Sequence, residues 1–224
     1  MNNMTEHRPY PATHEHDYIP AFGKDALLPF YDLLTRALGM GRAYDTLVAQ
    51  AQLTDTLRVL EIGCGTGNVT LRAKRVAPGA DVVGTDPDPL ALARAQRKAG
   101  GLTGIRFERA YAQQLPFPDG EFDRVLSSMM LHHLDADAKA ATAAEIHRVL
   151  RPGGALHVLD IGGPMTPHDG LAARRLLRNP HISGSLGDAI PRLLRSAGFD
   201  SSVVASRPHR LIGRLTFYRA VRQA

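Results

Sequence analysis

The sequence predicts an α/β fold with a mostly parallel seven-stranded β-sheet, one antiparallel strand and an N-terminal helical cap. Three observations support this prediction. Short apolar runs alternate with helix-like segments from residue 56 onward, a glycine-rich turn follows the first run, and an aspartate follows the second. Such alternation is typical of βαβ units, which place their strands in a parallel sheet with right-handed crossovers.

The individual elements follow from hydrophobic periodicity and from turn residues. Apolar residues at helical spacing predict two helices within residues 25–52, ahead of the sheet. Buried strands are expected at residues 57–62, 81–85, 105–108, 122–127 and 155–160. Helices are expected between them at residues 68–76, 89–99 and 137–150. Gly100 and Pro152 mark the ends of the last two helices.

The pattern changes after residue 160. A loop is expected at 162–169, followed by a short basic helix at 171–178 and a second helix at 187–197. Two alternating segments, 201–206 and 211–221, then predict a terminal antiparallel strand pair. The chain therefore has seven expected strands, of which one runs against the others.

Composition indicates an ordinary globular protein. Of the 224 residues, 44% are hydrophobic and 22% are charged, so the sequence is neither disordered nor collagen-like. The one cysteine, Cys64, has no partner for an internal disulfide. Neither a signal peptide nor an apolar run long enough to span a bilayer is evident. We therefore expect a cytoplasmic protein without stable membrane insertion.

Charge is distributed unevenly along the chain. Residues 1–170 hold 17 basic and 20 acidic residues, whereas residues 171–224 hold ten arginines and two aspartates. The basic segment is suited to an anionic substrate or a phospholipid surface, but arginine and alanine bias from GC-rich coding explains it equally simply. Nucleic-acid binding is not expected, because the segment has no aromatic stacking pattern.

A glycine loop and an acid carry the chemistry. Gly63, Gly65 and Gly67 lie between the first strand and the first helix of the sheet, and Asp86 lies 19 residues beyond Gly67. Glycines let a ligand approach the backbone, and an acid at the end of the second strand can accept both hydroxyls of a ribose. The spacing G-x-G-x-G lacks the third glycine of a dinucleotide fingerprint. The acid before the loop, Glu61, would also repel a pyrophosphate, so a ligand with an amino group fits better.

At this point the chain resembles the class I S-adenosylmethionine-dependent methyltransferases, which have a Rossmann-like fold. Five segments carry the resemblance: VLEIGCGTG at 59–67, VGTD at 83–86, LPFPDGEFD at 115–123, LHHL at 131–134 and EIHRVLRPGG at 145–154. They are most similar to the ubiquinone/menaquinone-biosynthesis-like branch. The resemblance implies one domain with a cap or lid (1–55), a cofactor-binding core (56–160) and an acceptor-side insertion with the terminal strands (161–224).

The resemblance also implies roles for individual residues toward S-adenosylmethionine. The three glycines would lie under its methionine part, Glu61 would help to orient its ammonium group, and Asp86 would bind the ribose. The other implied contacts are Pro87 beside the adenine, Ala112 and Gln113 at its amino edge, Ser127 at the methionine side and Tyr18 in a lid. Many relatives have Gly-Asp-Ala where this chain has Ala-Tyr-Ala at 110–112, so the adenine contact would depend on backbone atoms.

His132 and His133 follow the fourth strand, close to where the reactive methyl group would lie. One interpretation makes His132 a general base, and the other makes the pair a packing feature of the branch. A metal site is not expected, because adjacent histidines rarely bind one ion and no acidic cluster accompanies them.

The expected function is methyl transfer to a small, hydrophobic or amphipathic metabolite, with S-adenosylhomocysteine as the product. Two alternatives stay open. One is phospholipid N-methylation at a membrane surface, and the other is a non-catalytic scaffold that binds the cofactor. The sequence also leaves open whether the chain is a monomer or a homodimer.

Overall fold

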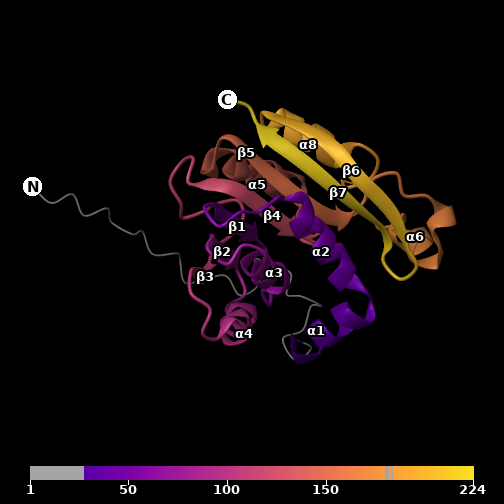
Figure 1. The fold of residues 1–224 in the computed structure, drawn as a ribbon. Helices are drawn as coiled ribbons and strands as arrows, with labels where there is room; N and C mark the ends of the chain where they lie inside the picture. Colours follow the sequence, from indigo (N-terminus) through magenta and orange to yellow (C-terminus); the bar gives the residue numbers. More distant parts are fainter. Residues whose placement is uncertain (1–27, 180–181, 183) are drawn as a thin grey trace, which may run out of the picture.

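The computed structural model describes residues 28–179, 182 and 184–224. Within this range a seven-stranded sheet has the order β3-β2-β1-β4-β5-β7-β6 (Figure 1). The strands are β1 (Arg58–Ile62), β2 (Asp81–Asp86), β3 (Ile105–Arg109), β4 (Phe122–Ser128), β5 (Leu150–Ile161), β6 (Phe199–His209) and β7 (Gly213–Arg222). Strands β1 to β5 pair in parallel, whereas β7 runs antiparallel to both β5 and β6. The predicted fold class is confirmed.

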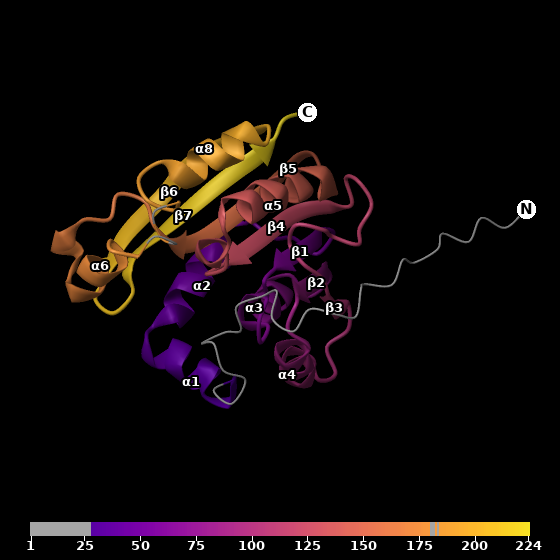
Figure 2. The ribbon, with the colours of Figure 1, turned by 180° about the vertical axis from the view of Figure 1, so that it is seen from behind.

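Helices cover both faces of the sheet. The described α-helices are α1 (Leu28–Ala37), α2 (Met40–Gln50), α3 (Asn68–Val76), α4 (Pro89–Ala99), α5 (Ala136–Val149), α6 (Leu171–Leu176) and α8 (Ala189–Ser196). Figures 1 and 2 show the two faces from opposite sides. On one face, Leu47 of α2 and Val69 of α3 share a core with Val59. On the other, Ile146 of α5 and Ile190 of α8 pack with Leu60.

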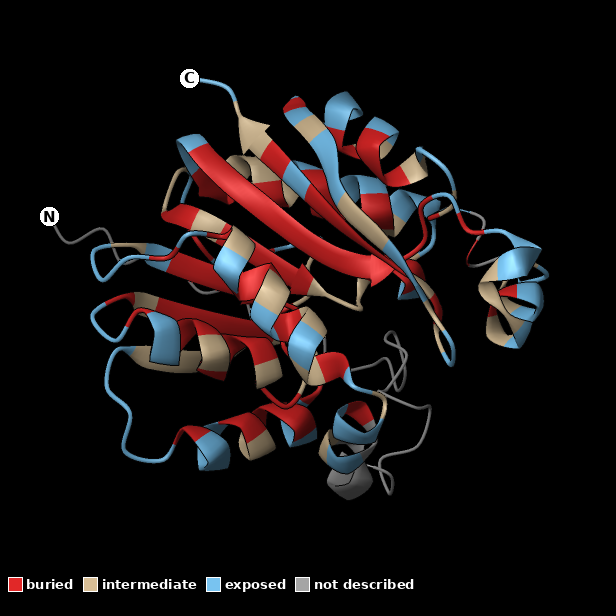
Figure 3. Cartoon of the chain, turned by 45° about the vertical axis from the view of Figure 1, so that its right-hand side comes forward, coloured by how far each residue is buried: buried red, intermediate tan, exposed pale blue. Residues whose placement is uncertain are grey.

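Burial on both faces explains the continuous apolar runs of the parallel strands. Val59, Leu60 and Ile62 of β1 are fully buried, although successive side chains point to opposite faces. In Figure 3 the central strands are almost entirely buried, whereas exposed residues lie along the outer helices and the hairpin of β6 and β7.

Element boundaries differ from the predictions where pairing extends beyond the local pattern. Strand β5 begins at Leu150 rather than 155, because Leu150 already pairs with Phe122 before a register shift in β4. Strand β6 is longer than expected, whereas β7 begins two residues later and ends one residue later than predicted, and the two strands meet in a hairpin that turns between His209 and Gly213. The two helices expected within residues 25–52 are α1 and α2, and the short helix expected at 171–178 ends at Leu176.

The sheet order places its topological switch point next to β1. The chain leaves β1 toward β2 on one side, whereas β4 pairs with the other side of β1. In open α/β sheets, ligands bind outside the carboxyl ends of the strands at such a switch point. The glycine loop after β1 and the residues after β4 both lie at this edge.

Candidate active site

The glycine loop leaves room for a ligand beside Gly65. All three loop glycines have positive φ angles, of 63°, 51° and 76° in chain order. A Cβ atom on Gly65 would have no neighbour within 4 Å, whereas one on Gly67 would lie 3.0 Å from Ala95 and 3.1 Å from Phe107. Gly67 therefore serves packing against α4 and β3, while Gly65 borders open space.

Asp86 contacts that loop directly from the end of β2. Its Oδ2 accepts a hydrogen bond from the Gly65 backbone N–H at 2.8 Å, and its Oδ1 accepts one from the Asp88 N–H at 2.9 Å. Each carboxylate oxygen keeps a second lone pair for a further donor. Burial raises the pKa of Asp86 to about 6. Asp86 thus titrates close to neutral pH in the absence of a ligand.

Glu61 points into the protein interior. It is 2% exposed, and the hydroxyl of Thr70 in α3 donates a hydrogen bond to its Oε2. Burial raises the pKa of Glu61 to about 8, so the free protein holds this side chain largely protonated at neutral pH. Its carboxyl group is therefore buried against α3 rather than exposed at the surface of the glycine loop.

The residues expected near an adenine lie next to Asp86. The backbone N–H of Ala110 donates to the Asp86 carbonyl oxygen at 3.3 Å, which ties the turn after β3 to the end of β2. Ala112 is partly exposed and Gln113 is exposed in that turn, and Pro87 is partly exposed beside it. Tyr18 lies outside the described residues.

The chain after β4 closes the other side of the loop. Ser127 is fully buried at the end of β4, and among the described residues its hydroxyl has no hydrogen-bond partner. Met129 has a positive φ of 57°, an uncommon value for a side chain of its size, which redirects the chain at the strand end. Met130 then packs against Gly63, where a Cβ atom would lie 2.5 Å from its Cγ.

His132 is held by a carboxylate that the sequence analysis did not single out. Its Nδ1 lies 2.5 Å from Oδ1 of Asp160, and its backbone N–H donates to Oδ2 of Asp160 at 3.2 Å. Asp160 is fully buried near the end of β5. Because β5 pairs with β4, an acid near the end of β5 must lie close to the residues that follow β4. The sequence signal that could have identified Asp160 was therefore an acid at the end of the strand expected to pair with β4.

The carboxylate fixes the ring of His132. With Asp160 at Nδ1, the neutral imidazole carries its proton on that nitrogen and keeps the lone pair of Nε2. No hydrogen-bond partner for this Nε2 occurs among the described residues. His133 is exposed, and its ring lies against that of His132 with centroids 3.9 Å apart. The structure therefore separates the two histidines: within the described part of the chain, only His132 has a carboxylate hydrogen-bond partner.

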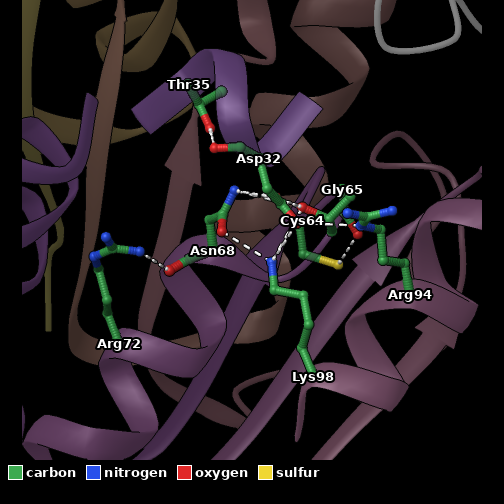
Figure 4. A network of polar contacts seen from close by, with 9 residues as sticks. Asp32, Thr35, Cys64, Gly65, Asn68, Arg72, Arg94 and Lys98 are labelled. Atoms are coloured by element: carbon green, nitrogen blue, oxygen red, sulfur yellow. Dashed lines mark hydrogen bonds and ion pairs between the residues drawn. The ribbon is translucent and has the colours of Figure 1, made fainter. Parts of the chain in front are cut away.

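A second network, also missed from the sequence, attaches helix α1 to the loop (Figure 4). Asp32 accepts hydrogen bonds from Thr66 Oγ1 at 2.6 Å and Asn68 Nδ2 at 3.0 Å, and it pairs with Arg94 and Lys98 of α4 at 3.1 and 3.2 Å. Burial opposes ionisation, but the Thr66 hydrogen bond and the charge of Lys98 lower the pKa of Asp32. The first described helix is thus tied to the outer side of the cofactor loop.

Together, the doubly wound sheet, the glycine loop at its switch point and the acid at the end of β2 define a Rossmann-like nucleotide-binding protein of the class I methyltransferase type. A sequence profile described as a methyltransferase domain matches residues 59–154. The demethylmenaquinone methyltransferase of Thermus thermophilus is 41% identical over 157 residues, which cover 66% of this chain and 68% of the relative. The enzyme of the same name from Deinococcus radiodurans is 38% identical over 143 residues, covering 62% and 58%.

Solved structures agree on the fold. A SAM-dependent methyltransferase from Aquifex aeolicus has a TM-score of 0.62 at 18% identity, covering 80% of this chain and 89% of that one. The chain belongs to the S-adenosylmethionine-dependent methyltransferases. It is a methyl-transferring enzyme whose cofactor is S-adenosylmethionine. Among the described residues, none of the helices has the length and hydrophobicity needed to span a bilayer.

Proposed function

We propose that this enzyme methylates a small, hydrophobic or amphipathic molecule bearing an acidic hydroxyl group, and that His132 is the general base. The observation that carries the proposal is the contact of 2.5 Å between His132 Nδ1 and Asp160. It leaves Nε2 able to accept a proton at the carboxyl ends of β4 and β5. An acceptor that loses a proton before or during transfer needs such a group, whereas a neutral amine is already nucleophilic.

The residues around the glycine loop fit S-adenosylmethionine. Bound there, the cofactor supplies a methyl group on a positively charged sulfur. The open space beside Gly65 and the free lone pairs of Asp86 support contacts to its methionine part and to its ribose. The unpartnered, buried hydroxyl of Ser127 supports a further polar contact at the end of β4. Pro87, Ala112 and Gln113 are partly or fully exposed after β2 and β3, and in this proposal they border the adenine.

The names of the relatives favour a quinol-type acceptor. Two of them are demethylmenaquinone methyltransferases by name, and the first is 41% identical to this chain. For such an acceptor, the ring hydroxyl gives its proton to Nε2 of His132, and the released electron pair makes a ring carbon nucleophilic. That carbon forms the new bond to the methyl group while the sulfur keeps the pair of the broken bond. The methylated ring then loses its carbon-bound proton and regains the hydroxyl, and His132 releases its proton to water.

The decisive experiment is an acceptor comparison. The enzyme is incubated with S-adenosylmethionine and either a reduced demethylnaphthoquinol with a short isoprenoid tail or vesicles containing phosphatidylethanolamine, and products are detected by mass spectrometry. We expect the quinol to gain one methyl group. The same quinone kept oxidised has no hydroxyl to deprotonate and is the matched control, so it should remain unmethylated. Methylated phosphatidylethanolamine without methylated quinol would overturn the proposal.

A further inference from the structure

Helix α1 supplies a carboxylate that holds the glycine loop. In the loop of residues 63–67, Cys64 and Thr66 carry the only side chains, because the other three residues are glycines. Glycine loses more conformational freedom on ordering than any other residue, so a side-chain anchor is important in such a loop. The Thr66 hydroxyl donates a hydrogen bond of 2.6 Å to Oδ1 of Asp32, and Thr66 is 1% exposed. Asp32 therefore fixes the loop at the residue next to Gly65.

The Asp32 carboxylate is saturated with donors from three parts of the chain. Its Oδ1 accepts hydrogen bonds from Thr66 in the loop and, at 3.0 Å, from Asn68 at the start of α3. Its Oδ2 accepts from Arg94 and Lys98 of α4 at 3.1 and 3.2 Å. These contacts fill the roughly four lone-pair positions of a carboxylate. One side chain thus joins α1 to the loop, to α3 and to α4 (Figure 4).

The contacts of α1 at its two attachment points differ in kind. Near its C-terminal end, the Leu38 carbonyl accepts a hydrogen bond of 2.9 Å from the His209 ring. In the middle of the helix, Asp32 makes the contacts to the loop and to α4. Among the other described side chains of α1, Thr35 is buried, but Leu33 is 65% exposed. The position of α1 beside the loop therefore depends strongly on the Asp32 carboxylate.

We propose that Asp32 is a positioning residue for the cofactor, which holds the glycine loop through Thr66 so that S-adenosylmethionine binds more tightly when α1 is in place. Asp86 holds the neighbouring residue, Gly65, from the end of β2. Two carboxylates from different elements thus order the loop before the cofactor binds, which lowers the entropy cost of binding. Because linkage is reciprocal, the bound cofactor in turn holds α1 in place. The inference rests on the proposed cofactor contacts of the loop and uses neither His132 nor the acceptor.

A double-mutant cycle tests the pair of Asp32 and Thr66, with S-adenosylhomocysteine binding measured by titration calorimetry. Asp32→Ala removes the carboxylate, and Thr66→Val removes the hydroxyl but keeps the size of the side chain. Each change should weaken binding about fivefold or more, the lower end of a typical coupling between sites. The double variant should lose little more than Asp32→Ala alone, because both changes remove the same contact. Wild-type affinity in Asp32→Ala, or fully additive losses, would overturn the inference.

Hydrogen exchange in α1 gives a readout that a purely structural role of Asp32 would not change. In the wild type, saturating S-adenosylhomocysteine should slow amide exchange in residues 28–37 by a factor similar to the affinity loss in Asp32→Ala. In Asp32→Ala, the saturating ligand should no longer slow this exchange. The wild-type measurement needs no variant, so it decides the question even if Asp32→Ala does not fold. Exchange in wild-type α1 that is the same with and without ligand overturns the inference.

Asp45→Ala is the matched control. Asp45 of α2 pairs with Arg72 of α3 at 2.8 Å, so it also joins two helices through a carboxylate and an arginine, but this pair does not include a loop residue. Its removal should leave both the affinity and the exchange of α1 unchanged, and an equal loss of affinity would overturn the specific role of Asp32. Asp86→Ala separates this inference from the proposed cofactor site. If Asp86→Ala weakens binding and Asp32→Ala does not, the cofactor site stands and the role of Asp32 is wrong.

Discussion

The Asp86 carboxylate and the Gly65 N–H are joined by a hydrogen bond of 2.8 Å that connects the second strand to the glycine loop across 21 residues. The bond couples the two parts of the cofactor motif before any ligand arrives. It also means that a ribose would meet a carboxylate already oriented by the backbone, which lowers the ordering cost of binding. Replacing Asp86 therefore affects both the direct contact and the shape of the loop.

Asp86→Ala should weaken binding of S-adenosylhomocysteine at least tenfold. Each lost hydrogen bond to a charged group contributes about 1.5–3 kcal/mol, and about 1.4 kcal/mol corresponds to a factor of ten. Titration calorimetry measures the change, with circular dichroism to show that the variant is folded. Affinity within twofold of the wild type would remove Asp86 from the proposed ribose site. Tight binding of NADH without S-adenosylhomocysteine binding would contradict the assigned cofactor.

Binding of S-adenosylhomocysteine should also depend on pH through Asp86. Burial raises the pKa of this carboxyl to about 6 in the free protein, and hydrogen bonds from ribose hydroxyls favour its charged form. Below pH 6 the Asp86 carboxyl is therefore mostly protonated, and it must release this proton when the ligand binds. We expect the dissociation constant to rise by up to about tenfold per pH unit below 6, and to be flat above pH 7. In Asp86→Asn this pH dependence should disappear. If the dissociation constant of the variant still changes with pH, another group causes the dependence.

Glu61 should make the free protein less stable as the pH rises. Its folded pKa of about 8 lies above the ordinary value of 4.5, so the folded state holds a proton that the unfolded state releases between these values. Stability from this group is complete below pH 4.5 and is lost as the pH rises toward 8. Glu61→Gln keeps the size and an acceptor for the Thr70 hydroxyl but cannot ionise. Urea denaturation at pH 5, 6.5 and 8 measures the free energy of unfolding. Between pH 5 and pH 8, this free energy should rise in the variant relative to the wild type by a few kcal/mol, on the order that such a pKa shift implies. A difference between the two proteins that does not change with pH would contradict the prediction.

His132→Ala should lower turnover about 10²–10⁴-fold while leaving the affinity for S-adenosylhomocysteine unchanged, as expected for a general base. His133→Ala is the matched control, because its ring is exposed and no described carboxylate forms a hydrogen bond or ion pair with it. Initial rates with the reduced naphthoquinol, together with the melting temperature, separate the two interpretations of the pair. If His132→Ala destabilises the protein but retains near-normal turnover, the histidines have a packing role.

The sequence predicted those parts of the molecule that depend on local patterns. The glycine loop, the acid at the end of β2 and the central strands lie where expected, because each is encoded within a few neighbouring residues. Asp160 was assigned to a strand without a role, since its contact with His132 crosses 28 positions and depends on the pairing of β4 with β5. Asp32 was missed for the same reason: its partner Thr66 lies 34 residues away. The early start of β5 reflects pairing with Phe122, which overrides the local turn signal of Pro152.

The last prediction concerns the basic C-terminal segment, whose exposed surface includes two leucines. Leu171 at the start of α6 is 80% exposed and Leu211 in the β6–β7 hairpin is 68% exposed. The two elements adjoin, because a Cβ atom on Gly170 would lie 3.9 Å from the Arg210 carbonyl oxygen. Exposed arginines share this end of the molecule: Arg174, Arg175, Arg178, Arg207 and Arg210.

Binding to vesicles should therefore be electrostatic and sensitive to salt. Each basic residue near an anionic surface contributes about 1 kcal/mol, whereas α6, with six residues, is too short to act as an amphipathic anchor. We expect no sedimentation with neutral vesicles, and binding to anionic vesicles that is lost as salt shortens the Debye length from about 10 Å at 0.1 M to 3 Å at 1 M. Arg175→Gln with Arg210→Gln should weaken that binding more than Leu211→Ser does, because charge rather than insertion supplies the attraction. Salt-resistant binding to neutral vesicles that is abolished by Leu211→Ser would show instead that the leucines enter the bilayer.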